Sequence, residues 1–238
     1  MNLKTKRLIR SLAQFVLAIS SLLFFRWMVF EPFVIPSGSM IPSLLVRDHI
    51  VVKKYVYGLR LPFTQKWLVR WGQVQRGDII VFRYPPQPDI FYVKRAVAIG
   101  GDRVELDRHG QLFVNGDPVD RQQLVGSPLI RPADAELGNF EEPRFYREDS
   151  GGRSRTIMLR PNARSSFGPF KVPKGHVFVL GDNRDNSRDS RFWGTLDENL
   201  LIGEASMIWL SCYQTLKSAP FVCDPSQLRW DRMFKPVQ

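Results

Sequence analysis

An apolar stretch near the amino end is the feature that most constrains how this chain can fold. Residues 11–25 carry no charge, and residues 1–10 before them hold four cations and no acid. As a helix, this stretch rises only about 22 Å, short of the roughly 30 Å hydrocarbon core of a bilayer. Continuing through Arg26 to Phe30 gives 20 residues, and a cation near one end can reach the headgroups. The sequence therefore predicts a transmembrane anchor over residues 11–30.

Two other interpretations fit the same stretch. A cleaved signal peptide also has a basic start and an apolar run, but no A-x-A site follows here, and Pro32 and Pro36 come instead. A buried helix of a soluble protein is the third interpretation, and it is disfavoured because four cations precede residues 11–30 and none follows them before Arg47. For an anchor, the charge asymmetry predicts a single pass of the cytoplasmic (inner) membrane. Residues 1–10 would form a cytoplasmic basic tail, with everything after Phe30 on the periplasmic or extracytoplasmic side.

The charge balance and the few cysteines narrow the possible partners. The chain has a formal net charge of +11, which is typical of proteins that bind nucleic acid or an anionic membrane surface. Because a cluster of these cations flanks the anchor, we expect a phospholipid membrane and no nucleic acid. The 2 cysteines lack a zinc-binding spacing and the 3 histidines are scattered, so we expect no metal and no cofactor.

Beyond Pro32 the chain reads as short strands separated by turn residues. The apolar, β-branched runs lie between Gly, Pro, Asp and Asn. They are HIVVKKYVYG, GDIIVFRYP, IFYVKRAVAIGGD, RVELD, QLFVNGD, HVFVLGDN and GEASMIWLS. This pattern predicts an all-β, mainly antiparallel body, barrel-like or sandwiched, with a hairpin joining RVELD to QLFVNGD. Residues 120–170 are polar with weak periodicity, which fits either an inserted subdomain or long loops.

A serine-rich turn follows the predicted anchor. Residues 36–42 read PSGSMIP, with a Ser-Gly-Ser between two prolines. Such a turn brings a hydroxyl and closely approaching backbone amides together, as a serine nucleophile with an oxyanion hole requires. An ordinary linker leaving the membrane has the same composition, so spacing alone leaves both interpretations open.

A lysine lies inside the predicted strand at residues 91–99. Alternation places Lys94 on the same face as Tyr92, Ala96 and Ala98. Desolvation on that face would lower the pKa of the lysine, as a general base requires, and no carboxylate shares the face. The alternative is a lysine on an edge strand whose ammonium reaches solvent.

A charged segment, GDNRDNSRDSRFWG at residues 181–194, follows the strand HVFVL. Asp182 and Asn186 have a spacing found in calcium loops, but Arg184 would occupy a ligand position and the EF-hand glycine is missing. The other interpretation is a turn in which Asp and Arg pair with one another and hold Ser187 at a strand end.

These three segments, in this order after an N-terminal anchor, resemble the bacterial type I signal peptidases (leader peptidases), which are membrane-bound Ser/Lys endopeptidases. The similarity runs from Arg26 through IPSGSM and YVKRAVAIGGD to GEASMIWLS and is least marked over residues 105–170. It implies a catalytic β domain over residues 31–104 and 171–238, with a smaller β subdomain inserted at 105–170. Many relatives have two transmembrane segments, whereas one precedes the serine turn here.

The resemblance also implies roles for individual residues. Ser39 matches the family nucleophile, and Lys94 matches its general base. Ser37 matches the hydroxyl that completes the oxyanion hole, and Ser187 the hydroxyl that orients the lysine amine. A supporting ion pair is matched by Asp189 and Arg191. The positions of the shallow S1 and S3 pockets, which accept small residues, are Ile35, Pro36, Met40, Leu44, Val81, Tyr92 and Val93.

The implied activity is removal of signal peptides from preproteins, with the secretion translocon nearby. A peptidase dedicated to one pilus or conjugation substrate would share these residues. A noncatalytic anchored β module that binds secreted chains is a further alternative. A Ser-His-Asp triad built on His49 or His176 is also open.

Two remaining features concern the body of the chain. Cys212 and Cys223 enclose 10 residues on the predicted extracytoplasmic side, where oxidation is possible, so we expect a disulfide. Two independent thiols are the alternative. The stretch PFTQKWLVRW, with Phe63, Trp67 and Trp71 among cations, fits either the core or a surface that contacts the membrane.

Overall fold

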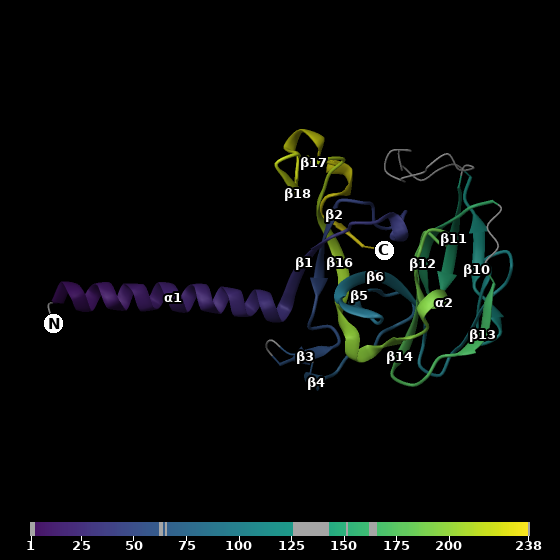
Figure 1. Ribbon diagram of the computed structural model, residues 1–238, viewed down its shortest axis with the longest axis horizontal. Coiled ribbons are helices and arrows are strands. Elements are labelled where there is room, and N and C mark those ends of the chain that lie inside the picture. The colour runs from purple at the N-terminus through teal and green to yellow at the C-terminus, as the bar shows by residue number, and fades with distance from the viewer. Residues whose placement is uncertain are drawn as a thin grey trace.

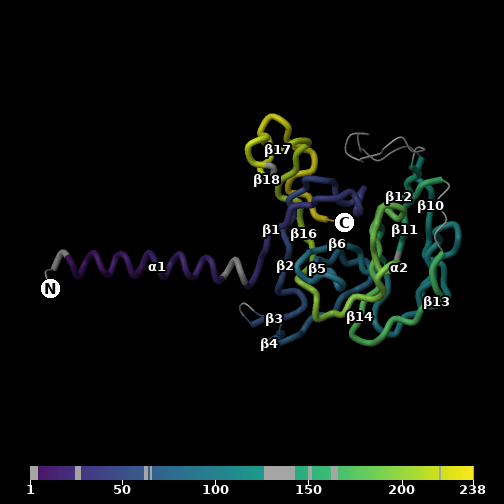
Figure 2. Tube along the Cα trace, in the orientation of Figure 1, coloured from purple at the N-terminus to yellow at the C-terminus, as the bar shows by residue number. Residues whose placement is uncertain are grey.

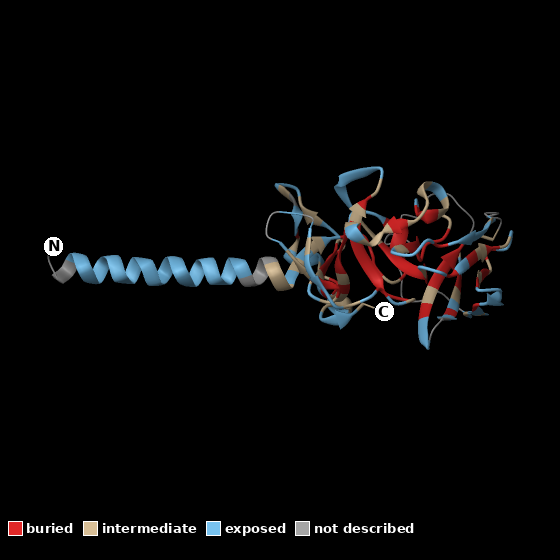
Figure 3. Ribbon diagram, turned by 90° about the horizontal axis from the view of Figure 1, so that it is seen from below, coloured by how far each residue is buried: buried red, intermediate tan, exposed pale blue. Residues whose placement is uncertain are grey.

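The computed structural model describes residues 3–61, 64, 66–125, 143–150, 152–161 and 166–237, and the account that follows concerns these. One long helix, α1 (Leu3–Val29), leads into a β-rich body, with the N-terminus at the far end of the helix (Figure 1). Its apolar span, Thr5–Phe24, is long enough to cross a membrane and none of it is buried (Figure 3).

The helix is longer at its start than the predicted anchor. It begins at Leu3 and so takes in the basic residues that were expected to form a tail. Lysine and arginine are good helix formers, and nothing in residues 3–10 breaks the helix. It ends at Val29, because Pro32 lacks a backbone N–H and restricts the residue before it to extended conformations.

An antiparallel sheet of eight strands forms the centre of the body. Its order brings together strands from both ends of the chain, so that β16 lies between β2 and β5. In spatial order the strands are β1 (Phe30–Val34), β2 (Asp48–Lys53), β16 (Leu201–Ser211), β5 (Ile79–Tyr84), β6 (Gln87–Ile99), β14 (His176–Leu180) and β15 (Leu196–Asp197), with β19 (Lys235–Pro236) beside β16.

Two smaller sheets come from residues 103–171 and lie at the end of the body away from α1 (Figure 2). The predicted hairpin is confirmed, since β7 (Arg103–Leu106) pairs with β8 (Leu112–Val114) in antiparallel register. Between residues 120 and 170 the described part holds strands rather than loops alone. The other strands of the two sheets are β9 (Asp117–Pro118), β10 (Asp120–Gln123), β11 (Arg144–Ser150), β12 (Arg153–Leu159) and β13 (Phe167–Lys171). The all-β fold with a smaller β region is therefore confirmed.

Short elements complete the body. Two hairpins lie on the side of the body toward α1 (Figure 1). They are β3 (Gly58–Arg60) with β4 (Trp67–Arg70), and β17 (Thr215–Leu216) with β18 (Ala219–Cys223). The short helices are η1 (Gly38–Met40), α2 (Ser190–Trp193), η3 (Glu198–Leu200), η4 (Pro225–Gln227) and η5 (Trp230–Arg232).

Strand β6 crosses the middle of the body and contributes to three hydrophobic clusters. Val93 packs against the cluster under β1 and β2, and Ala96 belongs to the cluster with Phe82. Val97 packs with Phe178 and with residues of the smaller sheets. Because residues 94–98 of β6 are buried, a side chain in this part of the strand has little freedom to move.

Candidate active site

Ser39 lies in η1, on the excursion that joins β1 to β2. Prolines on both sides of the turn prevent it from continuing as a strand or a helix. Asn183 fixes the turn from outside: its backbone N–H donates to Ser39 O at 3.1 Å and its Nδ2 donates to Gly38 O at 3.0 Å. The serine is 9% exposed and lies at the bottom of a cleft.

Lys94 reaches this serine from β6. Its Nζ lies 2.6 Å from Ser39 Oγ and 3.0 Å from Val93 O. The two residues are 55 positions apart in the sequence and meet because β6 passes beneath the serine turn. The lysine is 4% exposed, so its amine is almost completely removed from solvent. The contact predicted by the family resemblance is therefore formed.

Burial lowers the pKa of Lys94 from 10.5 to about 8, against the opposing charges of Asp189 and Asp182. Desolvation was the cause expected from the strand face. The sequence indicated only that no carboxylate shares the strand face of Lys94, and it did not indicate the two acids that lie near from elsewhere. The two acids approach from the segment after β14. At pH 8 about half of the amines are neutral and able to take a proton.

The two supporting serines differ in how they meet the dyad. Ser37 is exposed and its Oγ lies 3.5 Å from Ser39 Oγ. Ser187 is buried, and its Oγ has no hydrogen-bond partner among the described residues, so the predicted bond to Lys94 is not formed here. A Cβ at Gly181 would collide with both Ser187 Oγ and Ser39 O, which explains a glycine where these segments meet.

The charged segment pairs only in part with itself. Arg191 holds Asp189 through Nε at 2.8 Å and Nη2 at 2.9 Å, as the resemblance implied. Asp182 instead pairs with Arg95 on β6, and Arg184 pairs with Glu148 on β11. The expected pairing of Asp with Arg inside the turn is therefore formed by Asp189 and Arg191, while Asp182 and Arg184 pair outside it. Two of these charges connect the segment to other parts of the fold.

Sequence reasoning missed the buried partners of this segment. Glu148 is completely buried and accepts hydrogen bonds from Arg155 and Arg184. Burial alone would raise the pKa of Glu148, but the two guanidiniums outweigh it and hold that pKa below its usual value. Arg95 could have indicated one of these ion pairs. Alternation places it on the face of the strand away from Lys94, which is apolar, and a cation buried there needs a carboxylate partner.

A cleft of about 1230 Å³ opens above the dyad. Five of the seven predicted pocket residues line it: Ile35, Pro36, Met40, Tyr92 and Val93. Leu44 and Val81 are not among the lining residues of this cleft; they are fully buried in one hydrophobic cluster with Met40. The lining that the sequence did not indicate is Phe33, Val34, Asp89, Ile90, Phe91, Asp185, Asn186, Arg188 and Phe192.

A buried lysine in contact with a serine, at the floor of an apolar cleft, is the arrangement of a Ser/Lys hydrolase. The family described as "Signal peptidase, peptidase S26" matches this sequence over residues 8–210. The chain belongs to this family.

Three relatives called "Signal peptidase I" show how far the similarity extends. The protein of Pseudomonas fluorescens is 41% identical over 194 residues, and that of Pseudomonas aeruginosa is 39% identical over 194 residues. Each alignment covers 76% of this chain and 65% of the relative, so the match spans less than two thirds of those proteins. The Buchnera aphidicola protein is 33% identical over 236 residues, covering 85% of this chain and 75% of the relative.

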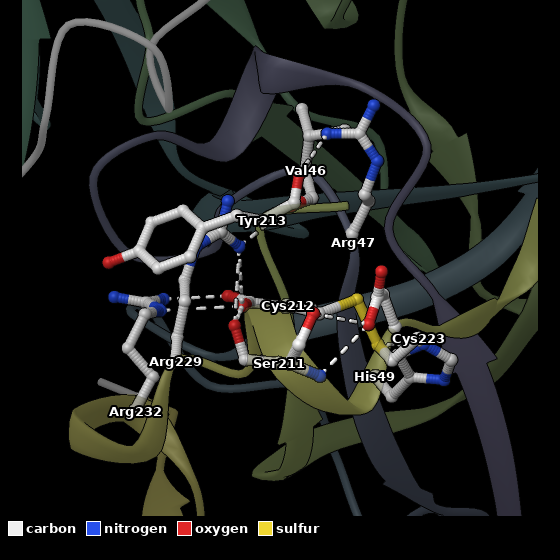
Figure 4. Close-up of a disulfide and its surroundings, with 12 residues drawn as sticks. Val46, Arg47, His49, Ser211, Cys212, Tyr213, Cys223, Arg229 and Arg232 are labelled. Atoms are coloured by element: carbon white, nitrogen blue, oxygen red, sulfur yellow. Dashed lines mark hydrogen bonds and ion pairs between the residues drawn. A yellow bond between two sulfur atoms is a disulfide. The ribbon is translucent and has the colours of Figure 1, made fainter. Parts of the chain in front are cut away.

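In this member of the signal peptidase family, the two histidines considered for a triad, His49 and His176, contact groups other than the serine. His49 Nε2 lies 3.5 Å from Cys223 Sγ, and His176 Nδ1 lies 3.3 Å from Lys174 O. Cys212 and Cys223 are joined in a disulfide beside His49 (Figure 4). These three side chains lie close enough together to hold a metal ion, but the two sulfurs are bonded to each other.

Proposed function

We propose that this chain is a membrane-anchored serine endopeptidase that removes N-terminal signal peptides from preproteins. The observation that carries the proposal is the 2.6 Å contact between Lys94 Nζ and Ser39 Oγ. It occurs at the floor of an apolar cleft, in a family whose curated members are called signal peptidase I.

In the acylation step, neutral Lys94 takes the proton of Ser39 while Oγ attacks the carbonyl carbon of the scissile bond. The negative charge that develops on the carbonyl oxygen is stabilised by the Ser39 N–H and the Ser37 hydroxyl. The protonated lysine then gives its proton to the leaving amine as the C–N bond breaks. The mature protein departs with a free N-terminus, and the signal peptide stays bound to Ser39 as an ester.

In the deacylation step, Lys94 is neutral again and takes a proton from a water molecule, which attacks the ester carbonyl. Breakdown of the second tetrahedral intermediate returns that proton to Ser39 Oγ. Asp189 with Arg191 would support the loop that carries Ser187, and Ser187 would orient the lysine amine.

The shape of the cleft supports a preference for small side chains next to the scissile bond. Met40, Tyr92 and Val93 form apolar walls close to the dyad. Leu44 and Val81 fill the space behind these walls and are completely buried, so the pockets cannot deepen without disturbing the core. A large substrate side chain next to the scissile bond would have to displace these packed atoms.

We place the body on the extracytoplasmic side of the membrane, with the N-terminus in the cytoplasm and the secretion translocon nearby. The cations of residues 1–10 support this orientation. Exposed apolar side chains on the β2–β4 region, near the end of α1, support contact with the lipid surface: Tyr55, Leu68, Val69 and Trp71. Phe63 lies outside the described residues.

Cleavage of a generic preprotein by the purified full chain in detergent tests the proposal. We expect cleavage by the wild type and none by Ser39→Ala or Lys94→Ala, while the exposed controls Ser226→Ala and Lys171→Ala cleave normally. Cleavage of only one dedicated precursor would favour the specialised peptidase. Binding of the preprotein without cleavage would favour the noncatalytic module, and undiminished cleavage by Ser39→Ala would exclude the serine as nucleophile.

A further inference from the structure

A second cavity lies at the base of α1, next to the serine cleft. Its volume is about 520 Å³, and among the described residues only Phe91 lines both cavities. Met28 of the helix forms part of its wall, and Lys54 of the body forms another part. The Lys54 N–H donates to Val29 O at 3.0 Å, which ties the end of the helix to this side of the body. The cavity is therefore built by the helix and the body together.

The position of Met28 gives the depth of the cavity relative to a bilayer. The predicted anchor ends at Phe30, and a helix rises about 1.5 Å per residue, so Met28 lies within about 3 Å of that end. The polar headgroup layer on each side of the hydrocarbon core is about 5–7 Å thick. If α1 spans the membrane as proposed above, the cavity opens where the hydrocarbon core meets the headgroup layer.

The lining of this cavity is strongly cationic. Of its described lining residues, Lys54, Arg60 and Arg83 are cations and Glu31 alone is an acid, with its carboxylate 3.1 Å from Lys54 Nζ. The carboxyl end of α1 adds about half a negative charge. The described lining of the cavity therefore carries more cations than acids.

The positions of the two arginines keep their charges close together. Arg60 is held by the backbone oxygen of Leu201 and by the ring of Trp67, whose centroid is 4.0 Å from its Cζ. Arg83 Nη1 donates to Pro88 O at 2.9 Å, and its buried Nε has no hydrogen-bond partner among the described residues. Burial, together with the charges of Arg83 and Arg70, lowers the pKa of Arg60 to about 10. An anion in the cavity would relieve this repulsion.

We propose that this cavity binds the phosphate group of an anionic phospholipid of the surrounding bilayer. Guanidinium groups present their N–H donors in a planar fork that matches phosphate oxygens, and Lys54 adds a point charge. Arg83 stands opposite Phe91 in the β5–β6 register, and Phe91 also lines the serine cleft. A bound lipid would therefore hold the cleft at a fixed height above the membrane. The inference rests on the membrane orientation proposed above.

Lipid binding to the full chain in a nonionic detergent tests this, with native mass spectrometry as the measurement. We expect phosphatidylglycerol to bind about tenfold more tightly than phosphatidylcholine, because only the former carries a net negative charge. Arg83→Gln and Lys54→Gln should each weaken phosphatidylglycerol binding about tenfold. The matched control is Arg144→Gln, which removes the same charge from an exposed position on β11, far from α1, and should bind like the wild type (Figure 1).

Equal affinity of the wild type and both cavity variants for phosphatidylglycerol would overturn the proposal. So would inorganic phosphate binding as tightly as the lipid, because the ligand would then be a soluble anion. Lys54→Gln keeps the test valid if Arg83→Gln does not fold, since Lys54 is only partly buried at a strand end. Cleavage of a preprotein is measured in parallel without added lipid. A wild type that cleaves the preprotein but does not prefer phosphatidylglycerol would reject this inference alone. A wild type that prefers phosphatidylglycerol but does not cleave would reject the peptidase function alone.

Discussion

Arg95 holds Asp182 in the interior of the body through two hydrogen bonds, from Nε to Oδ1 at 2.8 Å and from Nη2 to Oδ2 at 2.7 Å. The side chains are 4% and 1% exposed. Arg95 directly follows Lys94 on β6, and Asp182 lies beside Asn183, which bonds to the serine turn. The ion pair therefore joins the strand of the lysine to the loop that positions the serine.

Asp182→Asn should lower both the stability of the fold and the pKa of Lys94. The variant leaves the Arg95 guanidinium buried without its counter-charge, which costs about 3–5 kcal/mol in the free energy of unfolding. Since the Asp182 charge raises the pKa of Lys94, its loss should also move the pH profile of kcat/KM to lower pH. Thermal unfolding and pH-dependent kinetics measure the two effects, with the exposed Asp117→Asn as control. An unchanged pH profile in a folded variant would contradict the electrostatic role.

The family resemblance identified Ser39 and Lys94 as the dyad, whereas spacing alone left other interpretations open, and most of the structure that holds the dyad could not be predicted. The serine turn and the lysine strand are contiguous motifs, and each carries its chemistry in its own residues. Glu148 lies in a polar stretch with weak periodicity, and its partner Arg184 is 36 positions away in the sequence. No local sequence pattern therefore indicates that the two residues pair. Arg95 was the exception, because its place on an apolar strand face required a partner.

The limits of the fold prediction have similar physical causes. Strands and the β7–β8 hairpin were predictable because alternation and turn residues are local signals. The start of α1 was not, since lysines and arginines suit a helix as well as a solvated tail. Leu44 and Val81 were assigned to the pockets, but a linear motif cannot distinguish a wall residue from one in the layer behind it.

The pH dependence of kcat/KM should follow a single ionisation near pH 8. Lys94 is inactive as a base when protonated, and burial sets its pKa at about 8, so activity should fall as the pH drops through that value. Initial rates between pH 6 and 10 measure the profile. A rise near pH 6.5 that disappears in His176→Ala would instead assign the base to a histidine.

Ser37→Ala should reduce kcat by about 10²–10³-fold with little change in KM, because an oxyanion donor acts mainly in the transition state. Ser37→Thr keeps the hydroxyl and should recover most of the activity. Steady-state kinetics with a preprotein substrate separate kcat from KM. Equal losses in the two variants would mean that the hydroxyl is not the important group.

Replacing both disulfide cysteines, Cys212 and Cys223, by serine should lower stability without abolishing cleavage. The bond closes a loop with a sequence separation of 11, for which chain entropy alone accounts for about 3 kcal/mol. Neither cysteine lines the serine cleft. Thermal unfolding in the absence of reductant measures the loss. If alkylation of the denatured, unreduced wild type labels two thiols, the bond is not formed in the protein.

Lys94→Met should make the protein more stable at pH 7 while removing its activity. The pKa of this lysine is about 8 in the folded chain and 10.5 when unperturbed. Between these values the unfolded chain binds more protons, so stability of the wild type rises as the pH rises from 8 to 10.5. At pH 7 most of the buried amines are protonated, and keeping this charge out of water lowers the free energy of unfolding by up to about 3 kcal/mol. Methionine has a similar length and no charge to desolvate.

The stability gain of Lys94→Met should therefore be about 1–3 kcal/mol at pH 7 and should vanish near pH 10.5. Chemical denaturation of both proteins over this pH range measures the difference, so that groups common to both cancel. Lys171→Met, at an exposed position on β13, is the matched control and should show no such pH-dependent gain. A Lys94→Met protein that is less stable than the wild type at pH 7, with a parallel pH dependence, would show that the lysine is not destabilised by burial. The assignment of Lys94 as a neutral base at working pH would then lose its physical cause.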